Sequence, residues 1–252
     1  MKLNHKNYYS KKNNYISCSK LKVFIKDKAY YKRKYIDYSI EQEMTDALII
    51  GSAVDCLLTK GDKQFQKDFT VVARRSSNSE DTRIQINDTM LEKITGIVAS
   101  VKRQGIWNDL KSKQWKKQTI LTDDKLGICG MLDFLLVDGD HAIIVDLKTS
   151  NTIDPKKYYF LCWDYNYYLQ AAFYTTLVKA NYPDVKQVDF YHLAVEKDPD
   201  GIYNCALFLF MPQMIENETA FMLNKLAELR KETKFAPKSV GWNDKVLLAP
   251  LQ

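Results

Sequence analysis

The chain has 252 residues, of which 46% are hydrophobic, so it can bury a substantial core in one larger domain or two small ones. No stretch has the pattern of a signal peptide or the length of a membrane span, which predicts a soluble, cytoplasmic protein without a membrane partner. The five cysteines lack C-x-x-C spacing, which argues against a structural zinc site or a disulfide framework and favours reduced, mostly buried thiols. These cysteines are Cys18, Cys56, Cys129, Cys162 and Cys205.

The net charge of +6 is unevenly distributed. Residues 1–34 contain eleven Lys and Arg residues and a single acid, Asp27, whereas the rest of the chain carries a net charge of −4. A basic N-terminal segment on a slightly acidic body predicts an anionic partner, with nucleic acid as the first choice. The alternative is a segment whose charges only keep the protein soluble.

Two helices are predicted first. One begins near Ser17 or Ser19, either of which can cap its first turn, and continues to Tyr35. The other spans residues 41–59, and its apolar residues recur at helical spacing. They are Met44, Ala47, Leu48, Gly51, Val54 and Leu58. Asp55 falls on the same stripe, where a buried acid needs a cation or a hydrogen-bond donor. The simpler alternative is a bond from Asp55 to a backbone amide or a lysine.

Residues 60–87 are polar and predict a loop, and residues 88–104 predict an amphipathic helix. A strand near residues 117–121 precedes a β-hairpin over residues 126–148, in which two runs of branched and aromatic residues flank a polar Asp-Gly-Asp. We expect these hairpin strands to be central in the sheet.

A two-residue hairpin loop at positions 139–140 would place Asp133 opposite Asp146, with Cβ atoms about 5 Å apart. Lys148 shares a face with Asp146 because the two residues are two positions apart. Two close carboxylates repel and are costly to bury, and a divalent cation with oxygen ligands resolves both problems. Such a cation can polarise a phosphoryl oxygen and lower the pKa of a bound water, which Lys148 can hold. The alternative is an ordinary Asp-x-Lys on a solvated strand face.

A long helix is predicted over residues 154–180 by its Asp-Pro start. It is rich in aromatic residues, most of which we expect in the core, and Gln170 and Tyr174 share one of its faces. Two strands around a strong turn follow at residues 188–210, and an amphipathic helix at 212–234. No internal repeat or interdomain linker is evident. We therefore expect a single domain over residues 1–252, with a mostly helical N-terminal part (1–110) and a catalytic core (115–235).

The order of these elements resembles the PD-(D/E)xK nuclease superfamily, specifically its RecB-like branch and the RecE-type phage exonucleases. Four segments carry the resemblance, which spans roughly residues 16–210. They are Ile16-Ser-Cys-Ser-Lys-Leu-Lys-Val-Phe-Ile for the opening helix, Gly51-Ser-Ala-Val-Asp-Cys-Leu-Leu for the Gly-x-Ala-x-His helix, Gly130-Met-Leu-Asp with Val145-Asp-Leu-Lys-Thr for the core motif, and Gln170-Ala-Ala-Phe-Tyr for the Gln-x-x-x-Tyr helix. Each motif is weak alone, but their order on the right elements argues against chance.

The resemblance implies an α/β fold with a restriction-endonuclease-like core, in which helices flank a central mixed sheet and the N-terminal part adds helices. It also implies Mg²⁺- or Mn²⁺-dependent hydrolysis of DNA phosphodiester bonds. By position, Asp133 and Asp146 would ligate the metal together with the carbonyl of Leu147.

The same resemblance assigns three further roles. Lys148 would orient the attacking water, while Gln170 and Tyr174 would position the site or contact the DNA strand. The family setting implies a phage- or prophage-encoded protein in the cytoplasm of a bacterial host. A single-strand annealing protein and further copies of the chain are the partners to consider there.

Two positions depart from the family pattern. Asp55 stands where the helix motif usually has His; because Asp is a competent hard-metal ligand, we expect it in the metal site, where its shorter side chain can change the number or affinity of the metal ions. Some relatives hold an iron–sulfur cluster through four cysteines. Here the place after the opening helix reads Ile25-Lys-Asp-Lys, without a C-terminal cysteine group, so we predict no cluster.

Three functional hypotheses follow. The first is a metal-dependent exonuclease that acts on DNA ends in phage recombination or repair. The second keeps the same site but cleaves internally, as an endonuclease. The third is a catalytically decayed relative that only binds DNA, with Asp55 in place of His as the sign of decay.

Overall fold

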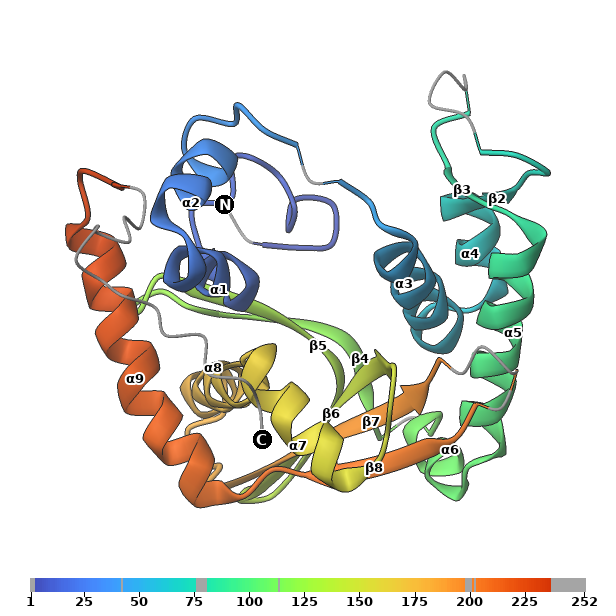
Figure 1. Ribbon diagram of the computed structural model, residues 1–252. Helices are drawn as coiled ribbons and strands as arrows, with labels where there is room; N and C mark the ends of the chain where they lie inside the picture. The colour runs from blue at the N-terminus through green and yellow to red at the C-terminus, as the bar shows by residue number, and fades with distance from the viewer. Residues whose placement is uncertain are drawn as a thin grey trace, which may run out of the picture.

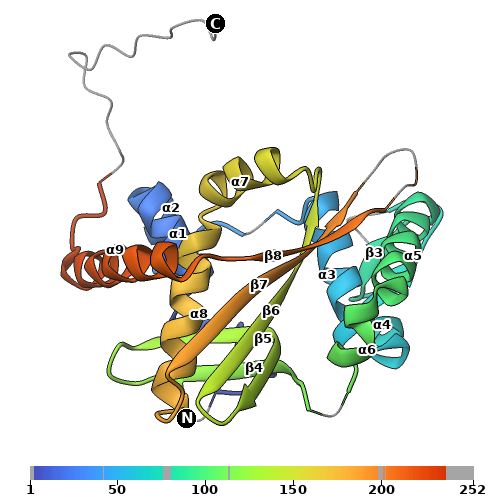
Figure 2. The same cartoon turned by 90° about the horizontal axis from the view of Figure 1, so that it is seen from below.

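The computed structural model describes residues 3–41, 43–75, 81–112, 114–197, 201 and 203–236. A twisted, mixed six-stranded sheet lies between two layers of helices (Figures 1 and 2). Its strands are β1 (Ile16–Ser17), β4 (Lys116–Asp123), β5 (Ile128–Asp138), β6 (His141–Ser150), β7 (Gln187–Glu196) and β8 (Cys205–Leu209). They follow the order β1-β5-β6-β7-β8, and β4 pairs with β5. The predicted α/β core with a central mixed sheet is confirmed.

Two hydrophobic clusters hold the helices on the two faces of the sheet. The first cluster joins the sheet to α1 (Cys18–Lys26), α2 (Lys28–Tyr35), α7 (Pro155–Asp164), α8 (Tyr167–Asn181) and α9 (Pro212–Lys231). The second joins it to α3 (Asp46–Thr59), α5 (Asp88–Arg103) and α6 (Gly105–Leu110), beside α4 (Asp62–Asp68) and the short strands β2 (Phe69–Val71) and β3 (Ile84–Ile86). Neighbouring residues of one strand face opposite clusters, so Ile144 packs in the first and Val145 in the second.

The central hairpin has the predicted register. Asp138 pairs with His141 across a two-residue loop, and the antiparallel ladder of β5 and β6 ends one step before Asp133 and Asp146. Strand β1 pairs with β5 at residues 128–129, on the edge that β6 also uses, because β4 occupies the other edge. Strands β1 and β6 therefore follow one another along one edge of β5, and Asp133 lies between the residues that pair with each; we call this opening the fork of the sheet.

Two helices that we predicted as continuous are each broken once. Asp27 ends α1 and caps α2, with its carboxylate accepting a hydrogen bond from the backbone N–H of Tyr30 at 2.8 Å. Asn166 adopts a left-handed conformation, with φ of 50°, between α7 and α8. Asp and Asn are residues that readily cap helices and tolerate such turns, and both breaks lie within runs that otherwise favour a helix.

The prediction for residues 41–87 was also partly wrong. Helix α3 begins at Asp46, after a cap from Thr45, rather than at Glu41. The predicted loop contains α4 and the strands β2 and β3. The rings of Phe65 and Phe69 stack 5.0 Å apart where α4 runs into β2, and Phe69 is buried in the second cluster, packing that polar composition does not reveal.

The buried face of α3 is rotated from the predicted stripe. Ile49, Ile50 and Ala53 lie in the core, whereas Met44 and Leu48 are 45% and 43% exposed. Both faces of this helix are apolar, so periodicity alone could not choose between them.

The predictions for the helix at residues 88–104 and for the state of the cysteines were confirmed. The helix at residues 88–104 buries its expected face, and all five cysteines are free thiols, four of them buried. Among the described residues no helix is long and apolar enough to cross a membrane.

Candidate active site

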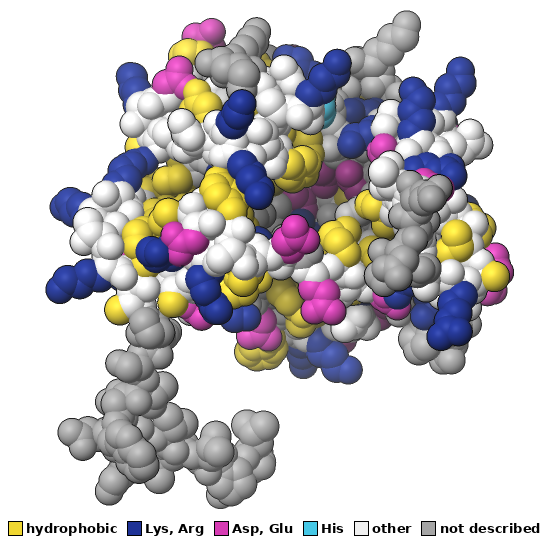
Figure 3. All heavy atoms as spheres, turned by 90° about the horizontal axis from the view of Figure 1, so that it is seen from above, with side chains coloured by type: hydrophobic (Ala, Val, Ile, Leu, Met, Phe, Trp, Pro, Cys, Tyr) yellow, Lys and Arg dark blue, Asp and Glu magenta, His cyan; other side chains and the backbone are white. Residues whose placement is uncertain are grey.

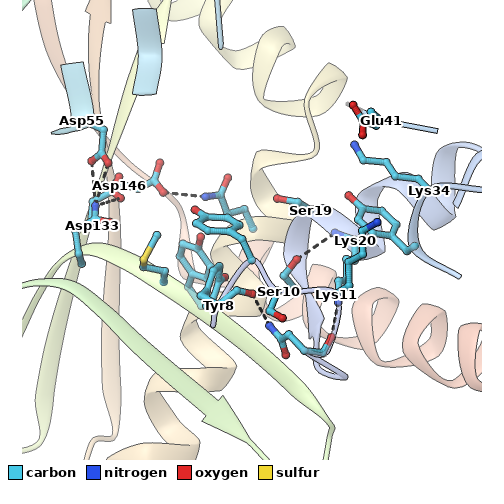
Figure 4. Close-up of a pocket in the computed structure, with 18 of the residues that line it drawn as sticks. Tyr8, Ser10, Lys11, Ser19, Lys20, Lys34, Glu41, Asp55, Asp133 and Asp146 are labelled. Atoms are coloured by element: carbon cyan, nitrogen blue, oxygen red, sulfur yellow. Dashed lines mark hydrogen bonds between the residues drawn. The ribbon is translucent and has the colours of Figure 1, made fainter. Parts of the chain in front are cut away.

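Three carboxylates approach one another at the fork of the sheet (Figure 4). Asp133 lies on β5 and Asp146 on β6. Asp55 comes from α3, which belongs to the helical layer of the second cluster. Lys148 follows two residues after Asp146, and its ammonium group pairs with the Asp146 carboxylate. The structure thus brings together the four charged residues that the sequence analysis selected.

Asp146 is held by three side chains. It is only 3% exposed, and its Oδ1 accepts a hydrogen bond from Nε2 of Gln170 on α8 at 2.8 Å. Its Oδ2 contacts Lys148 and lies 3.7 Å from Nε2 of His192. The predicted positioning role of Gln170 therefore has a structural basis in this hydrogen bond.

His192 is a residue of the site that the sequence analysis missed. It lies opposite Asp146 in the parallel β6–β7 ladder and is fully buried. Burial, reinforced by the charges of Lys148 and Lys22, holds the pKa of His192 well below its ordinary value, so the ring is neutral. The Tyr158 hydroxyl lies 2.8 Å from Nδ1. The tautomer in which Nδ1 accepts this bond places the ring proton on Nε2, facing Asp146.

Asp55 and Asp133 are joined by a second missed residue, Gln118 on β4. The Gln118 Nε2 atom lies 3.0 and 3.2 Å from the two carboxylate oxygens of Asp55 and 3.1 Å from Oδ1 of Asp133. The other oxygen of Asp133 accepts a hydrogen bond from the backbone N–H of Leu147 at 2.9 Å. This contact places Leu147, a predicted metal ligand through its carbonyl, directly beside Asp133.

Burial destabilises the charged forms of Asp55 and Asp133. Burial raises the pKa of Asp55 to about 6, and burial together with the charges of Asp55 and Asp146 raises the pKa of Asp133 well above its ordinary value. Burial alone would lower the pKa of Lys148, but the carboxylates of Asp146 and Asp133 outweigh it and the pKa is raised. Lys148 therefore carries a positive charge at neutral pH, among carboxylates that need a cation.

Tyr174 lies one helical turn after Gln170 on α8, and both residues line a cavity that the three acids also line. Its ring passes close to Gly130 of β5, where an added Cβ would stand 3.0 Å from Tyr174 and 2.6 Å from Leu177. Glycine at this position of the core motif thus allows α8 to approach the sheet and places Tyr174 beside the acids.

The acids form one end of a cavity of about 680 Å³. The basic N-terminal segment covers this cavity and contributes Lys11, Lys20 and Lys34 to its wall (Figure 4). Figure 3 shows acidic side chains in a hollow of the surface with Lys and Arg around it. The N-terminal positive charge that predicted an anionic partner is therefore placed within reach of the site.

A second cavity, of about 500 Å³, lies between α3 and α7 and also includes Asp55. Leu48, Tyr165 and Lys197 line it, so the first part of the apolar stripe predicted for α3 faces this cavity, while its last two residues, Val54 and Leu58, lie in the core as predicted. Five of the nine aromatic residues of the helix predicted over residues 154–180 lie in the core or pack against it, as expected, and four do not. Tyr159, Phe160, Trp163 and Tyr165 are 40–65% exposed.

The chain was compared with known families and structures. The family model described as "PDDEXK-like domain of unknown function (DUF3799)" matches residues 17–242. The chain belongs to this family. The crystal structure of a candidate exonuclease from Eubacterium rectale has a TM-score of 0.68 at 18% identity, and the match covers 100% of this chain and 97% of the other. The PDDEXK-like domain also matches the crystal structure of SSO0001 at a TM-score of 0.38 and 13% identity, over 91% and 83% of the chains, which is too low to support an argument. No curated protein matches its sequence.

The donor atoms of this PDDEXK-like domain suit a hard divalent cation, since the site offers carboxylate, carbonyl and amide oxygens. Within the described ranges, no group of three or more His, Cys, Asp and Glu side chains could hold a metal ion as placed. The Gln118 amide nitrogen donates to the carboxylates of both Asp55 and Asp133, so the two acids already face one positively polarised group, as two ligands of one cation would. The oxygen atoms present therefore fit the cation that the family implies.

Proposed function

We propose that this chain is a Mg²⁺- or Mn²⁺-dependent deoxyribonuclease that hydrolyses phosphodiester bonds from DNA ends. The observation that carries the proposal is the meeting of Asp55, Asp133, Asp146 and Lys148 at the end of a cavity whose wall is cationic. Three neighbouring acids repel one another, and burial raises the pKa values of Asp55 and Asp133, so this group is costly to keep in a fold unless a cation is bound.

In this proposal, Asp55 and Asp133 hold the metal with the Leu147 carbonyl and with Asp146. A bound divalent cation would polarise the scissile phosphate and make a water nucleophilic at neutral pH. Lys148, fixed by Asp146, orients that water or offsets the charge that develops on the phosphate. Gln170 and His192 keep the Asp146 carboxylate in place, and a fixed carboxylate loses less entropy when the reaction begins.

The shape of the cavity supports cleavage from an end. Its volume of about 680 Å³ is that of a site for one drug-sized ligand, which suits one or two nucleotides of a single strand rather than a duplex. Tyr8, Lys11 and Lys34 of the N-terminal segment line the wall opposite the acids, so a strand reaches the site most simply by entering with its end. The role in phage recombination or repair, with an annealing protein as partner, rests on the sequence resemblance.

A DNA-binding relative without activity is the second candidate. One specific observation favours it: the described acids do not form a three-residue metal group, and the Gln118 amide lies between two of them. Such a protein would bind DNA through its basic segment and leave it intact.

Incubation of the purified protein with linear DNA in Mg²⁺, in Mn²⁺ and in EDTA tests the proposal. We expect degradation only with the metals, and its loss in Asp133→Asn. Asp184→Asn, a change at an exposed position, is the matched control and should cleave as the wild type does. Intact DNA with the metal-loaded wild type would refute the nuclease and favour the binding protein.

A further inference from the structure

Gln118 has an unusual place in the sheet. It lies in the middle of β4 yet is absent from the ladder that pairs Lys117 with Phe134 and Thr119 with Leu132. Its φ is 48°, a left-handed conformation that is uncommon and strained for a residue other than glycine. This strained position lies beside Asp133, so the local distortion of the strand coincides with the candidate site.

The side chain of Gln118 is buried, at 4% exposure, and only half of its amide is satisfied. The nitrogen donates to the carboxylates of Asp55 and Asp133, as described above. The oxygen Oε1 is buried and has no hydrogen-bond partner among the described residues. A buried acceptor without a partner loses its hydrogen bond to water, so hydrogen bonding alone would not favour this arrangement.

We propose that Gln118 is a metal-binding residue of this site, whose amide oxygen serves as a neutral ligand beside Asp55 and Asp133. This inference rests on the proposed function, because it assumes that the site takes a divalent cation. In the metal-free protein the amide nitrogen holds the two carboxylates together. When the cation is present, rotation of the amide about its last side-chain bond turns the oxygen toward it.

The spacing of the atoms supports this exchange. Oxygen ligands of octahedral Mg²⁺ lie about 2.1 Å from the ion, so adjacent ligands are about 3.0 Å apart. The terminal amide atom of Gln118 lies 3.0 to 3.2 Å from carboxylate oxygens of Asp55 and Asp133. One position therefore serves as a hydrogen-bond donor without the metal and as an adjacent ligand with it. Rotation of the Gln118 amide would replace Nε2 by Oε1 at this position.

The proposal also explains why these acids do not form a three-residue metal group. Both oxygens of Asp146 are engaged, one by Gln170 and the other by Lys148. An amide oxygen is a ligand that Mg²⁺ and Mn²⁺ accept, so Gln118 would add a neutral side-chain oxygen to the carboxylates of the site.

Mn²⁺ binding to DNA-free protein, measured by calorimetry in wild type and two variants of Gln118, tests the inference. Gln118→Met keeps the length of the side chain but has no ligand oxygen, and we expect its Mn²⁺ affinity to fall at least tenfold. Gln118→Glu restores an oxygen, and we expect it to bind Mn²⁺ at least as tightly as the wild type. Circular dichroism confirms that each variant is folded, and the Glu variant shows that a change at this position is tolerated.

Unchanged or tighter Mn²⁺ binding by Gln118→Met would overturn the inference, because the amide would then only compete with the cation for the acids. A wild type that binds Mn²⁺ but leaves DNA intact would refute the nuclease and still permit the comparison of the Gln118 variants. A wild type that binds no Mn²⁺ would overturn both proposals.

Discussion

The raised pKa of Asp55 can be tested through the pH dependence of stability. Burial raises its pKa to about 6; the Asp146 charge adds to this increase, while Lys60 and Lys148 oppose it. In an unfolded chain an Asp ionises near pH 4. The folded protein therefore retains a proton that the unfolded chain releases between about pH 4 and 6. The stability that this proton contributes is full below about pH 4 and is lost as the pH rises through about 6.

We therefore predict that metal-free wild type loses thermal stability relative to Asp55→Asn as the pH rises from 4 to 7. The Asn side chain cannot ionise, so its variant lacks this component of the pH dependence. Thermal unfolding in EDTA at a series of pH values measures the difference between the two proteins. Parallel profiles would contradict the assignment of a raised pKa to Asp55.

The broken helices show how single residues set the ends of an element. Asp27 ends α1 and caps α2, so that the two helices pack separately against the core. We predict that Asp27→Ala lowers the free energy of unfolding by about 1 kcal/mol, because the N–H of Tyr30 loses its acceptor. Asp27→Asn, which still caps, should lose only a small part of this. Urea unfolding of the three proteins provides the measurement, and equal losses in Ala and Asn would show that the cap itself is unimportant.

Much of the candidate site could be predicted from the sequence because it depends on local geometry. A two-residue loop fixes the register of one hairpin, and that register places Asp133, Asp146 and Lys148 together. His192 and Gln118 could not be predicted this way. The first depends on a parallel pairing of β6 and β7 that is set by packing, and the second on a left-handed residue within a strand.

The predicted fold class was likewise correct, while the details of helix packing were not. Helix α3 has two apolar faces, and only its contact with α5 and the sheet decides which of them is buried. The aromatic residues of α7 are a similar case: Phe160 and Trp163 lie outside the core because α7 packs on the sheet through its other face, which carries Tyr158 and Cys162.

At the scale of the whole molecule, the N-terminal segment places positive charge over an acidic site (Figures 3 and 4). We predict that DNA affinity falls as salt rises, and that Lys11→Gln reduces the slope of log K against log salt by about 0.7, the value for one phosphate contact on a single strand. Lys186→Gln is the control, since Lys186 is exposed beside the hairpin loop and pairs with Asp140 there. Fluorescence anisotropy at several salt concentrations gives both slopes, and equal slopes for the two variants would exclude Lys11 from the DNA interface.

The most direct test of the account is digestion of end-labelled linear duplex beside a covalently closed circle of the same sequence, in Mg²⁺ and in Mn²⁺. Lys148→Ala provides the control for the site. The account predicts that the linear substrate is lost, the circle survives, and the variant leaves both intact. Cleavage of the circle would contradict an exonuclease and indicate an endonuclease. Cleavage by Lys148→Ala equal to that of the wild type would contradict the site itself.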